Sequence, residues 1–221
     1  MSIRSILMVT AVSLTTTVAL AQTGAGDGFV ISAESVEGSE GPVGRVVHLE
    51  GDVTITRGGA TLVGRHGTYY EERGLAVVFG DVHGVDGESR IACDTLRYYR
   101  DLDRAYLIGN ASYADTSGVT TAQRINIYRQ ERLAVCLGDA AAVDHEGTFE
   151  LLAGRILYDF DRGEARASEA PTLRTFSEEG EEEGTLSASL IEILPDGDRI
   201  TAYGDALITT PEVSARARLA V

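Results

Sequence analysis

The sequence predicts an all-β fold in which about a dozen strands, mostly antiparallel, stack in chain order. Three observations support this prediction: a glycine that recurs at a fixed spacing, apolar residues that alternate with polar ones, and turn residues between the alternating stretches. Alternation with a period of two is typical of strands, whereas the apolar spacing of three and four that is typical of helices is nowhere sustained. Stacked repeats of this kind predict an elongated molecule.

The amino terminus has the layout of a secretory signal. Residues 1–21 read MSIRSILMVTAVSLTTTVALA, with one positive charge at Arg4, an apolar middle and small residues at Ala19 and Ala21. This order of segments predicts cleavage after residue 21 and export, which would place the mature protein in the periplasm. The alternative is an uncleaved membrane anchor, which needs about 18 or more predominantly apolar residues. Residues 22–44 are then expected to form a leader and a first strand, and residues 45–221 a single repeat domain.

The composition excludes a nucleic-acid-binding protein. The 221 residues include 34 acidic residues and 19 basic ones, all of them arginine, which gives a formal charge of −15. Such a chain lacks the basic stripe that nucleic-acid recognition requires, so we expect no nucleic-acid partner. The hydrophobic fraction of 43% is that of a globular protein, and 25 glycines with four prolines favour many turns.

A repeat of 29 residues runs through the middle of the chain. Four segments, HLEGDVTI, VVFGDVHG, YLIGNASY and VCLGDAAA, align on the glycines Gly51, Gly80, Gly109 and Gly138. A second landmark follows the same step and then slips by two residues: Tyr69, Tyr98, Ile127 and Tyr158. Two landmarks that stay in register through four units indicate a true repeat. The pattern weakens in ARASEAPTLRTF and returns in ITAYGDALITT, around Gly204.

Each unit is expected to contain two strands. In RVVHLEGDVTIT the apolar side chains are two residues apart, in the same register as Gly51. Turn residues separate the two strands of each unit at 57–59, 86–87, 116–118 and 146–147. Polar junctions separate successive units at 71–74, 100–103, 129–132 and 161–163.

Stacking places equivalent residues in three inward columns. The first contains Leu49, Val78, Leu107, Cys136 and later Ala202; the second Val47, Ala76, Ala105 and Ala134; the third Val53, Val82, Ala111 and Ala140. Two of the columns change from valine to alanine along the chain. Small side chains either let two sheets approach closely or leave a slot between them, and both alternatives stay open.

The opposite register is also apolar in the later units. Its residues are Val77, Phe79, Tyr106, Ile108, Val135 and Leu137. Strands that are apolar on both faces are either covered on both sides or present a contact surface.

The sequence contains little that indicates catalysis or metal binding. The four histidines are scattered, and the loop around His83, with Asp81, Asp86 and Glu88, is more typical of a turn than of a cation site. The acidic run at 178–183 is expected to be a solvated insertion. Cys93 and Cys136 fall in units that are not adjacent, which predicts two buried free thiols. We therefore expect no catalytic residues, no metal and no cofactor.

The repeat resembles that of the OstA-like domain, x-L-x-A-D-R-x-x-Y-D followed by x-V-x-L-x-G-N/D-V. The segments that carry the resemblance are IACDTLRYYRDLDRAYLIGNASY, TAQRINIYRQERLAVCLGDAAA, LLAGRILYDFDRGEARA and, more loosely, LVGRHGTYYEERGLAVVFGDVHG. The similarity covers residues 45–165 well and extends weakly to Val221. This domain occurs in LptA, LptC and the periplasmic part of LptD, which are components of lipopolysaccharide transport.

The resemblance implies a slightly open β-jellyroll whose apolar interior shields acyl chains, and end-to-end joining through edge strands. The implied function is a non-enzymatic, periplasmic lipid-binding and bridging protein of lipopolysaccharide transport and outer-membrane assembly. Its implied partners are lipopolysaccharide or a related lipid, other Lpt-type β-jellyroll proteins and further copies of this chain. The residues expected to face the lipid are Val47, Leu49, Val53, Ile55, Ala76, Val78, Val82, Leu107, Ala111 and Ala140.

Two further expectations concern charge and the competing function. Exposed arginines on one side would form a ladder for lipid phosphates: Arg65, Arg90, Arg97, Arg124 and Arg155. The alternative function is a structural or protein-docking β-rod, which includes an LptC-like membrane-anchored adaptor if the amino-terminal segment is not cleaved.

Overall fold

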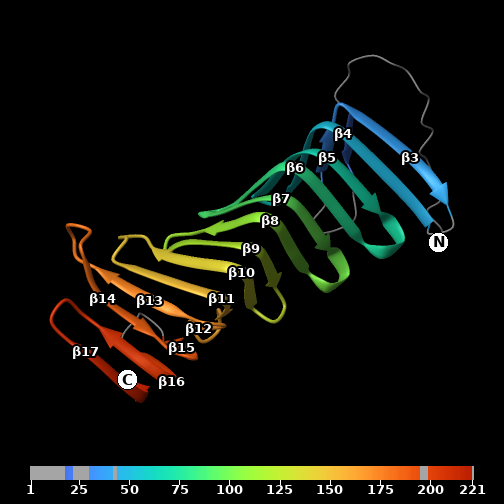
Figure 1. Ribbon diagram of the computed structural model, residues 1–221. Coiled ribbons are helices and arrows are strands. Elements are labelled where there is room, and N and C mark those ends of the chain that lie inside the picture. Colours follow the sequence, from blue (N-terminus) through green and yellow to red (C-terminus); the bar gives the residue numbers. More distant parts are fainter. Residues whose placement is uncertain (1–17, 22–29, 42–43, 195–198, 221) are drawn as a thin grey trace.

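The protein is a rod made from one antiparallel sheet that folds over on itself (Figure 1). The computed structural model describes residues 18–21, 30–41, 44–194 and 199–220, and these form a 17-stranded sheet. Strands that follow one another in the chain mostly lie side by side, so the stacking predicted from the repeat is confirmed. Within the described ranges, no helix is both long and apolar enough to span a membrane.

The four units of the repeat form the eight long strands of the rod. These are β4 (Gly44–Arg57), β5 (Ala60–Tyr70), β6 (Leu75–Asp86), β7 (Ser89–Tyr99), β8 (Arg104–Ala114), β9 (Gly118–Tyr128), β10 (Leu133–Asp144) and β11 (Phe149–Asp159). The predicted turns and polar junctions fall between them. Two of the junctions contain short 3-10 helices, η1 (Glu71–Arg73) and η2 (Arg100–Leu102).

Shorter strands complete the two ends. At one end are β1 (Val18–Ala21), β2 (Val30–Ala33) and β3 (Ser35–Gly41). At the other are β12 (Glu164–Ser168), β13 (Thr172–Phe176), β14 (Glu182–Ser187), β15 (Leu190–Ile193), β16 (Ile200–Thr209) and β17 (Ser214–Ala220). Residues 1–17 of the predicted signal lie outside the described residues, and its last four residues form β1, which pairs with β2.

A β-bulge at the repeating glycine folds the sheet. In β6, Gly80 and Asp81 have φ angles of 83° and 49°, and together they lie opposite the single residue Asp94 of β7. The same pair of left-handed residues recurs at Gly51, Gly109, Gly138 and Gly204 and the residue after each. An extra residue of this kind bends its strand. The bend divides each long strand into two halves.

We name the two halves by their position relative to the bulge. The first wall contains residues 44–50, 66–79, 95–108, 124–137 and 155–168. The second wall contains residues 53–64, 82–93, 111–122 and 140–153. The two walls meet along the row of bulges, which we call the corner, and their free margins form the mouth of the folded sheet.

Glycine is favoured at the corner for two reasons. The φ angle at this position is positive, and residues that have a Cβ adopt a positive φ only at an energetic cost. In addition, a Cβ on Gly80 would lie 3.0 Å from the Cβ of Arg65, and a Cβ on Gly138 would lie 2.7 Å from the Oε1 of Gln123. The repeating glycine therefore marks the place where one strand crosses closely over a side chain of its neighbour.

The repeat weakens in the sequence because the fifth corner has no glycine. Glu169 and Ala170 take the left-handed conformation there, with φ angles of 64° and 59°. Pro171 follows and interrupts the ladder, so one repeat strand is divided into β12 on the first wall and β13 on the second. The next strand is divided at the same corner into β14 and β15, and these two divisions account for two of the strands beyond the predicted dozen.

The predicted inward columns are in the core. All members of the first and third columns are buried, and in the second column Ala134 is buried while the other three members are half-buried. Cys93 and Cys136 are buried and free, which confirms that prediction. Burial raises the pKa of the Cys93 thiol to about 11 and that of Cys136 to about 12.

Candidate functional site

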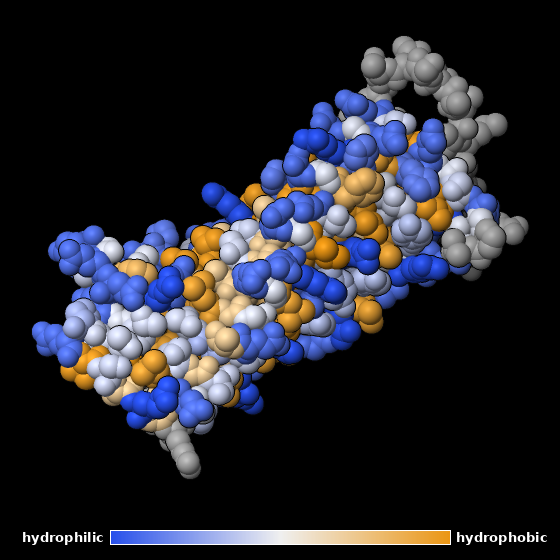
Figure 2. Space-filling view, viewed as in Figure 1, coloured by the Kyte–Doolittle hydropathy of each residue, from blue (hydrophilic) through white to orange (hydrophobic). Residues whose placement is uncertain are grey.

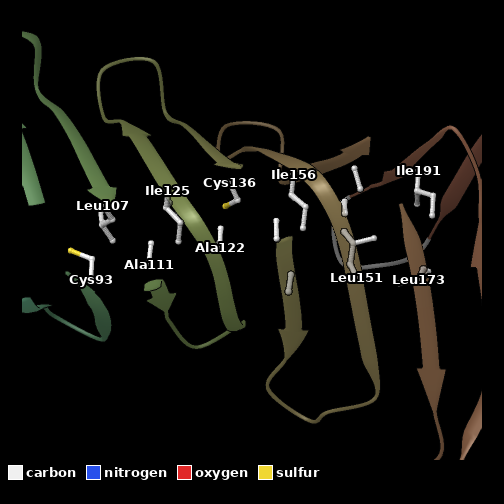
Figure 3. Close-up of a cluster of buried hydrophobic side chains, with 14 of the residues drawn as sticks. Cys93, Leu107, Ala111, Ala122, Ile125, Cys136, Leu151, Ile156, Leu173 and Ile191 are labelled. Atoms are coloured by element: carbon white, nitrogen blue, oxygen red, sulfur yellow. The ribbon is translucent and has the colours of Figure 1, made fainter. Parts of the chain in front are cut away.

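A continuous line of apolar side chains follows the corner along the rod. Figure 3 shows side chains from Cys93 through Leu107, Ile125 and Ile156 to Ile191 succeeding one another between the strands. They belong to one buried cluster that extends from Val78 to Ala206. A smaller cluster around Leu49 and Val53 continues the line toward the amino-terminal end, and Ile55 packs against both clusters.

The structure brings the ten residues predicted to face a lipid together in this interior. Seven of them are fully buried: Leu49, Val53, Val78, Val82, Leu107, Ala111 and Ala140. Val47, Ile55 and Ala76 are half-buried, because they lie farther from the corner and nearer the mouth. Their contact with a lipid remains a prediction.

The small side chains of the interior let the walls approach closely. A Cβ on Gly64 of the second wall would lie 2.5 Å from Cγ1 of Val78 on the first, and a Cβ on Gly67 of the first wall would lie 3.4 Å from Cγ1 of Val53 on the second. The space left by the missing side chains at these glycines is thus filled by larger side chains from the neighbouring strand. Of the two alternatives that the sequence left open, close approach describes this state of the protein.

A row of large and small residues lines the first wall near the mouth. Residues in register across the strands alternate in size: Tyr69, Ala76, Tyr98, Ala105, Ile127, Ala134, Tyr158 and Ala165. They share the inward face with the buried first column, which is two residues nearer the corner. The alanines leave room for the neighbouring rings, and this row is the physical basis of the second landmark of the repeat. Burial raises the pKa of Tyr158 to about 12.

Polar contacts span the mouth between the two walls. Arg57 Nη1, at the end of β4 on the second wall, donates to the Tyr98 hydroxyl at 3.2 Å. Tyr98 in turn donates to Asp103 Oδ1 at 2.9 Å. Arg57 belongs to the second wall, whereas Tyr98 and Asp103 belong to the first wall and its margin. The hydrogen bond from Arg57 to Tyr98 therefore joins the two walls.

Two more contacts cross the mouth in the next units. Arg129, at the first-wall margin after β9, pairs with Asp86 of the second wall at 3.0 Å. The hydroxyls of Thr120 on the second wall and Tyr158 on the first are 3.2 Å apart. Sequence reasoning did not predict these contacts. The recurrence of tyrosine at the second landmark was a signal for the contacts of Tyr98 and Tyr158, whereas the Asp86–Arg129 pair had none.

The five arginines predicted to form a ladder do not lie on one side. Arg65 lies at the corner and pairs with Asp81, and Arg90 lies on the outer face of the second wall. Arg97, Arg124 and Arg155 share the outer face of the first wall. The predicted ladder fails because the corner separates the two halves of each strand. Arginines can lie on one side of the rod only when they belong to the same half of their strands.

The outer face of the first wall also carries the second apolar register. Phe79 is 40% exposed and stacks on His66 with 5.1 Å between ring centroids, whereas Val77, Ile108 and Leu137 are half-buried. Figure 2 shows apolar side chains interspersed with polar ones along the middle of the rod, without one unbroken patch. This face is therefore a partly exposed surface and not a second core.

The charged loops provide no metal site in the part of the chain that the structure describes. No three of its His, Cys, Asp and Glu side chains gather closely enough to hold an ion, and this includes the loop around His83. The acidic run at 178–183 is exposed, as predicted; residues 178–181 lie in the connection between β13 and β14, and Glu182 and Glu183 begin β14.

The fold and its interior define an elongated β-jellyroll with an apolar line between two walls. No family model and no curated protein matches the chain. Among solved structures, it is similar to the crystal structure of LptH, the LptA homologous periplasmic component of the conserved lipopolysaccharide transport device from Pseudomonas aeruginosa. The identity is 20% and the TM-score is 0.46, over 50% of this chain and 82% of that one.

Proposed function

We propose that this protein is a non-enzymatic, periplasmic lipid-binding protein of lipopolysaccharide transport and outer-membrane assembly. The observation that carries the proposal is the apolar line that passes through successive units between the two walls. The repeat motif that resembles the OstA-like domain supports it independently. In this proposal the acyl chains of a lipid lie between the walls while its polar part stays outside the mouth.

The physical reason for such an interior is the cost of exposing acyl chains to water. Each exposed methylene costs about 0.8 kcal/mol, so a lipid with several chains needs a continuous apolar surface along its path. Alanine and valine columns suit transfer, because a smooth lining offers many weak sites in place of one deep one. We propose the ten predicted residues as this lining, with Ala111 and Ala140 at its centre.

The first experiment is to ask whether lipid co-purifies with the mature chain. Native mass spectrometry of protein produced in a Gram-negative host is expected to detect an acylated lipid. A lipid-free preparation that also fails to bind lipopolysaccharide would contradict the proposal and favour the structural or docking rod.

Substitution of Ala140 by phenylalanine is expected to weaken lipid binding about tenfold or more. The added ring would occupy space between the walls, and displacing two methylenes costs about 1.6 kcal/mol. The matched control is Ala141→Phe, because Ala141 is next in the chain and faces outward from the same strand. Ala140→Val provides a graded variant in case the larger one unfolds. Equal binding by Ala140→Phe and Ala141→Phe would place the lipid elsewhere.

The partners in this proposal dock on the end strands. Within the described residues, β3 pairs only with β4 and β17 only with β16, so each end offers a free strand edge. The charges of the two edges are opposite: Glu37 and Glu40 are exposed on β3, and Arg216 is exposed on β17. Opposite charges on free edges favour head-to-tail pairing of β-jellyrolls, either with further copies of this chain or with related proteins.

Reversal of the charge on β3 is therefore expected to weaken self-association. The variant Glu37→Arg/Glu40→Arg should sediment as smaller species than the wild type at low ionic strength, because its edge would repel Arg216 of the next copy. Glu178→Arg/Glu179→Arg makes the same change of net charge in an exposed loop away from the edges. Equal sedimentation of the two variants and the wild type would argue against pairing through β3.

A further inference from the structure

We propose that the polar contacts across the mouth act as a latch that limits the sideways entry of acyl chains. The latch consists of the Arg57–Tyr98–Asp103 chain, the Asp86–Arg129 ion pair and the Thr120–Tyr158 hydrogen bond. The inference rests on the proposed function, because it concerns access to the same interior. It adds a place of entry, the mouth between units, and the groups that hold this place closed.

The first argument is that these contacts join the two walls and not neighbouring strands. Their partners are 41, 43 and 38 residues apart in the chain. Other polar pairs near the mouth stay within one wall: Ser89 and Tyr113 are both on the second, and Arg104 and Glu131 are both at the margin of the first. Only the contacts that join the two walls oppose separation of the walls.

The second argument is that the interior has to open before it can receive a chain. Val78, Val82, Leu107 and Ala111 pack against one another, so an acyl chain can lie between the walls only if these move apart. The corner is held by the hydrogen-bonded strands themselves, whereas the margins are held by side chains. Separation at the mouth therefore disrupts the fewest interactions.

The third argument is that the latch is weak enough to open. Arg129 and Asp86 are each 53% exposed, so water and salt screen their attraction. The Thr120–Tyr158 contact lies deeper, where Tyr158 is half-buried. An exposed ion pair of this kind changes an equilibrium by a factor of about two to five.

A latch makes an unusual prediction about variants. If the closed state predominates, the apparent affinity is reduced by the fraction of molecules that are open. Removing a latch contact should raise that fraction, so uptake becomes faster and binding tighter. Loss of a contact that only stabilises the fold would leave uptake unchanged or reduce it.

The experiment measures uptake of N-phenyl-1-naphthylamine, an uncharged probe that fluoresces in apolar surroundings, by stopped-flow mixing with the full mature chain. Arg129→Gln is expected to accelerate uptake about two- to fivefold, and Tyr158→Phe, which keeps the ring, should act in the same direction. Arg104→Gln and Tyr203→Phe remove an ion pair and a hydroxyl contact that each stay within one wall, and they should match the wild type. Arg129→Lys, which keeps the charge, should return the rate toward that of the wild type.

Salt provides a second test of the same contact. Raising sodium chloride from about 0.05 M to about 0.5 M should accelerate uptake by the wild type, because it screens Asp86 and Arg129. The Arg129→Gln variant should respond less. An equal response of both proteins would remove the ion pair from the latch.

The outcomes separate this inference from the proposed function. If the folded wild type takes up no probe, or if Ala140→Phe takes it up as the wild type does, the lipid-binding interior is wrong. If the wild type takes up probe and Ala140→Phe does not, while Arg129→Gln and Tyr158→Phe are no faster than their within-wall controls, only the latch is overturned. Thermal unfolding of each variant shows that the rates come from folded protein.

Discussion

Replacement of Gly118 by alanine is expected to destabilise the protein by about 3 kcal/mol. Gly118 begins β9 and has a φ of 156°, and an added Cβ would overlap the carbonyl oxygen of Val143 and lie 3.0 Å from Cα of Asp144. Both of these neighbours are backbone of β10, so they cannot move aside as the end of a side chain can. The strain therefore has to be relieved by separating two hydrogen-bonded strands.

Urea denaturation of Gly118→Ala beside Gly59→Ala tests this expectation. Gly59 lies in the turn just before β5, but a Cβ there has no atom within 4 Å and its φ is not positive. The Gly59 variant should stay within about 0.5 kcal/mol of the wild type. The comparison requires that the dependence of the unfolding free energy on urea be the same in all three proteins. Similar midpoints for the two variants would show that β10 yields more easily than its backbone contacts suggest.

Gly118 also illustrates what a single sequence can and cannot predict. The sequence marked 116–118 as a turn, because glycine beside threonine and serine is typical of turns. Nothing in the sequence distinguished Gly118 from Gly59, since the difference lies in a strand that starts fifteen residues later, at Leu133. Local chemistry predicts turns, but the space around a turn depends on the strand that packs against it.

The recurring glycine of the repeat lies at the corner wherever it is present, although the bend itself was not predicted. Gly51, Gly80, Gly109 and Gly138 all take the left-handed conformation, and the apolar residues two positions to either side are buried. The glycine landmark is absent at the fifth corner because Glu169 and Ala170 adopt that conformation there. A conformational preference can be overridden by the surrounding strands, and such a position leaves no mark in the sequence.

The contacts across the mouth were not predictable for a different reason. Cross-strand neighbours follow from the register of a hairpin, so the row from Tyr69 to Tyr158 could be aligned from the repeat alone. Partners on opposite walls depend on how far one wall is displaced along the rod relative to the other. Arg57 meets Tyr98 and Asp86 meets Arg129, which is about one and a half units farther along the chain. That displacement is set by the bend at every corner together, and no local pattern records it.

Replacement of Leu107 by alanine is expected to reduce the free energy of unfolding by about 3 kcal/mol. Leu107 is 0% exposed, and its neighbours in register, Leu96 and Ile125, are also buried. The loss consists of the transfer free energy of the deleted carbons and the cost of the cavity that remains. Ala111 and Cys136 in the same cluster are too small to fill the space, so little collapse is expected.

The control for Leu107→Ala is Leu102→Ala, which removes the same atoms from a side chain that is 49% exposed, in η2. Urea denaturation should show a change of less than about 0.5 kcal/mol for that variant.

A loss below about 1 kcal/mol for Leu107→Ala would mean that the walls close over the vacated space. Walls that move so readily would need no latch at the mouth, because the interior would then open and close with little resistance from its own packing. A loss near the expected value instead requires that the walls keep their separation, which is the condition under which contacts at the mouth can control entry.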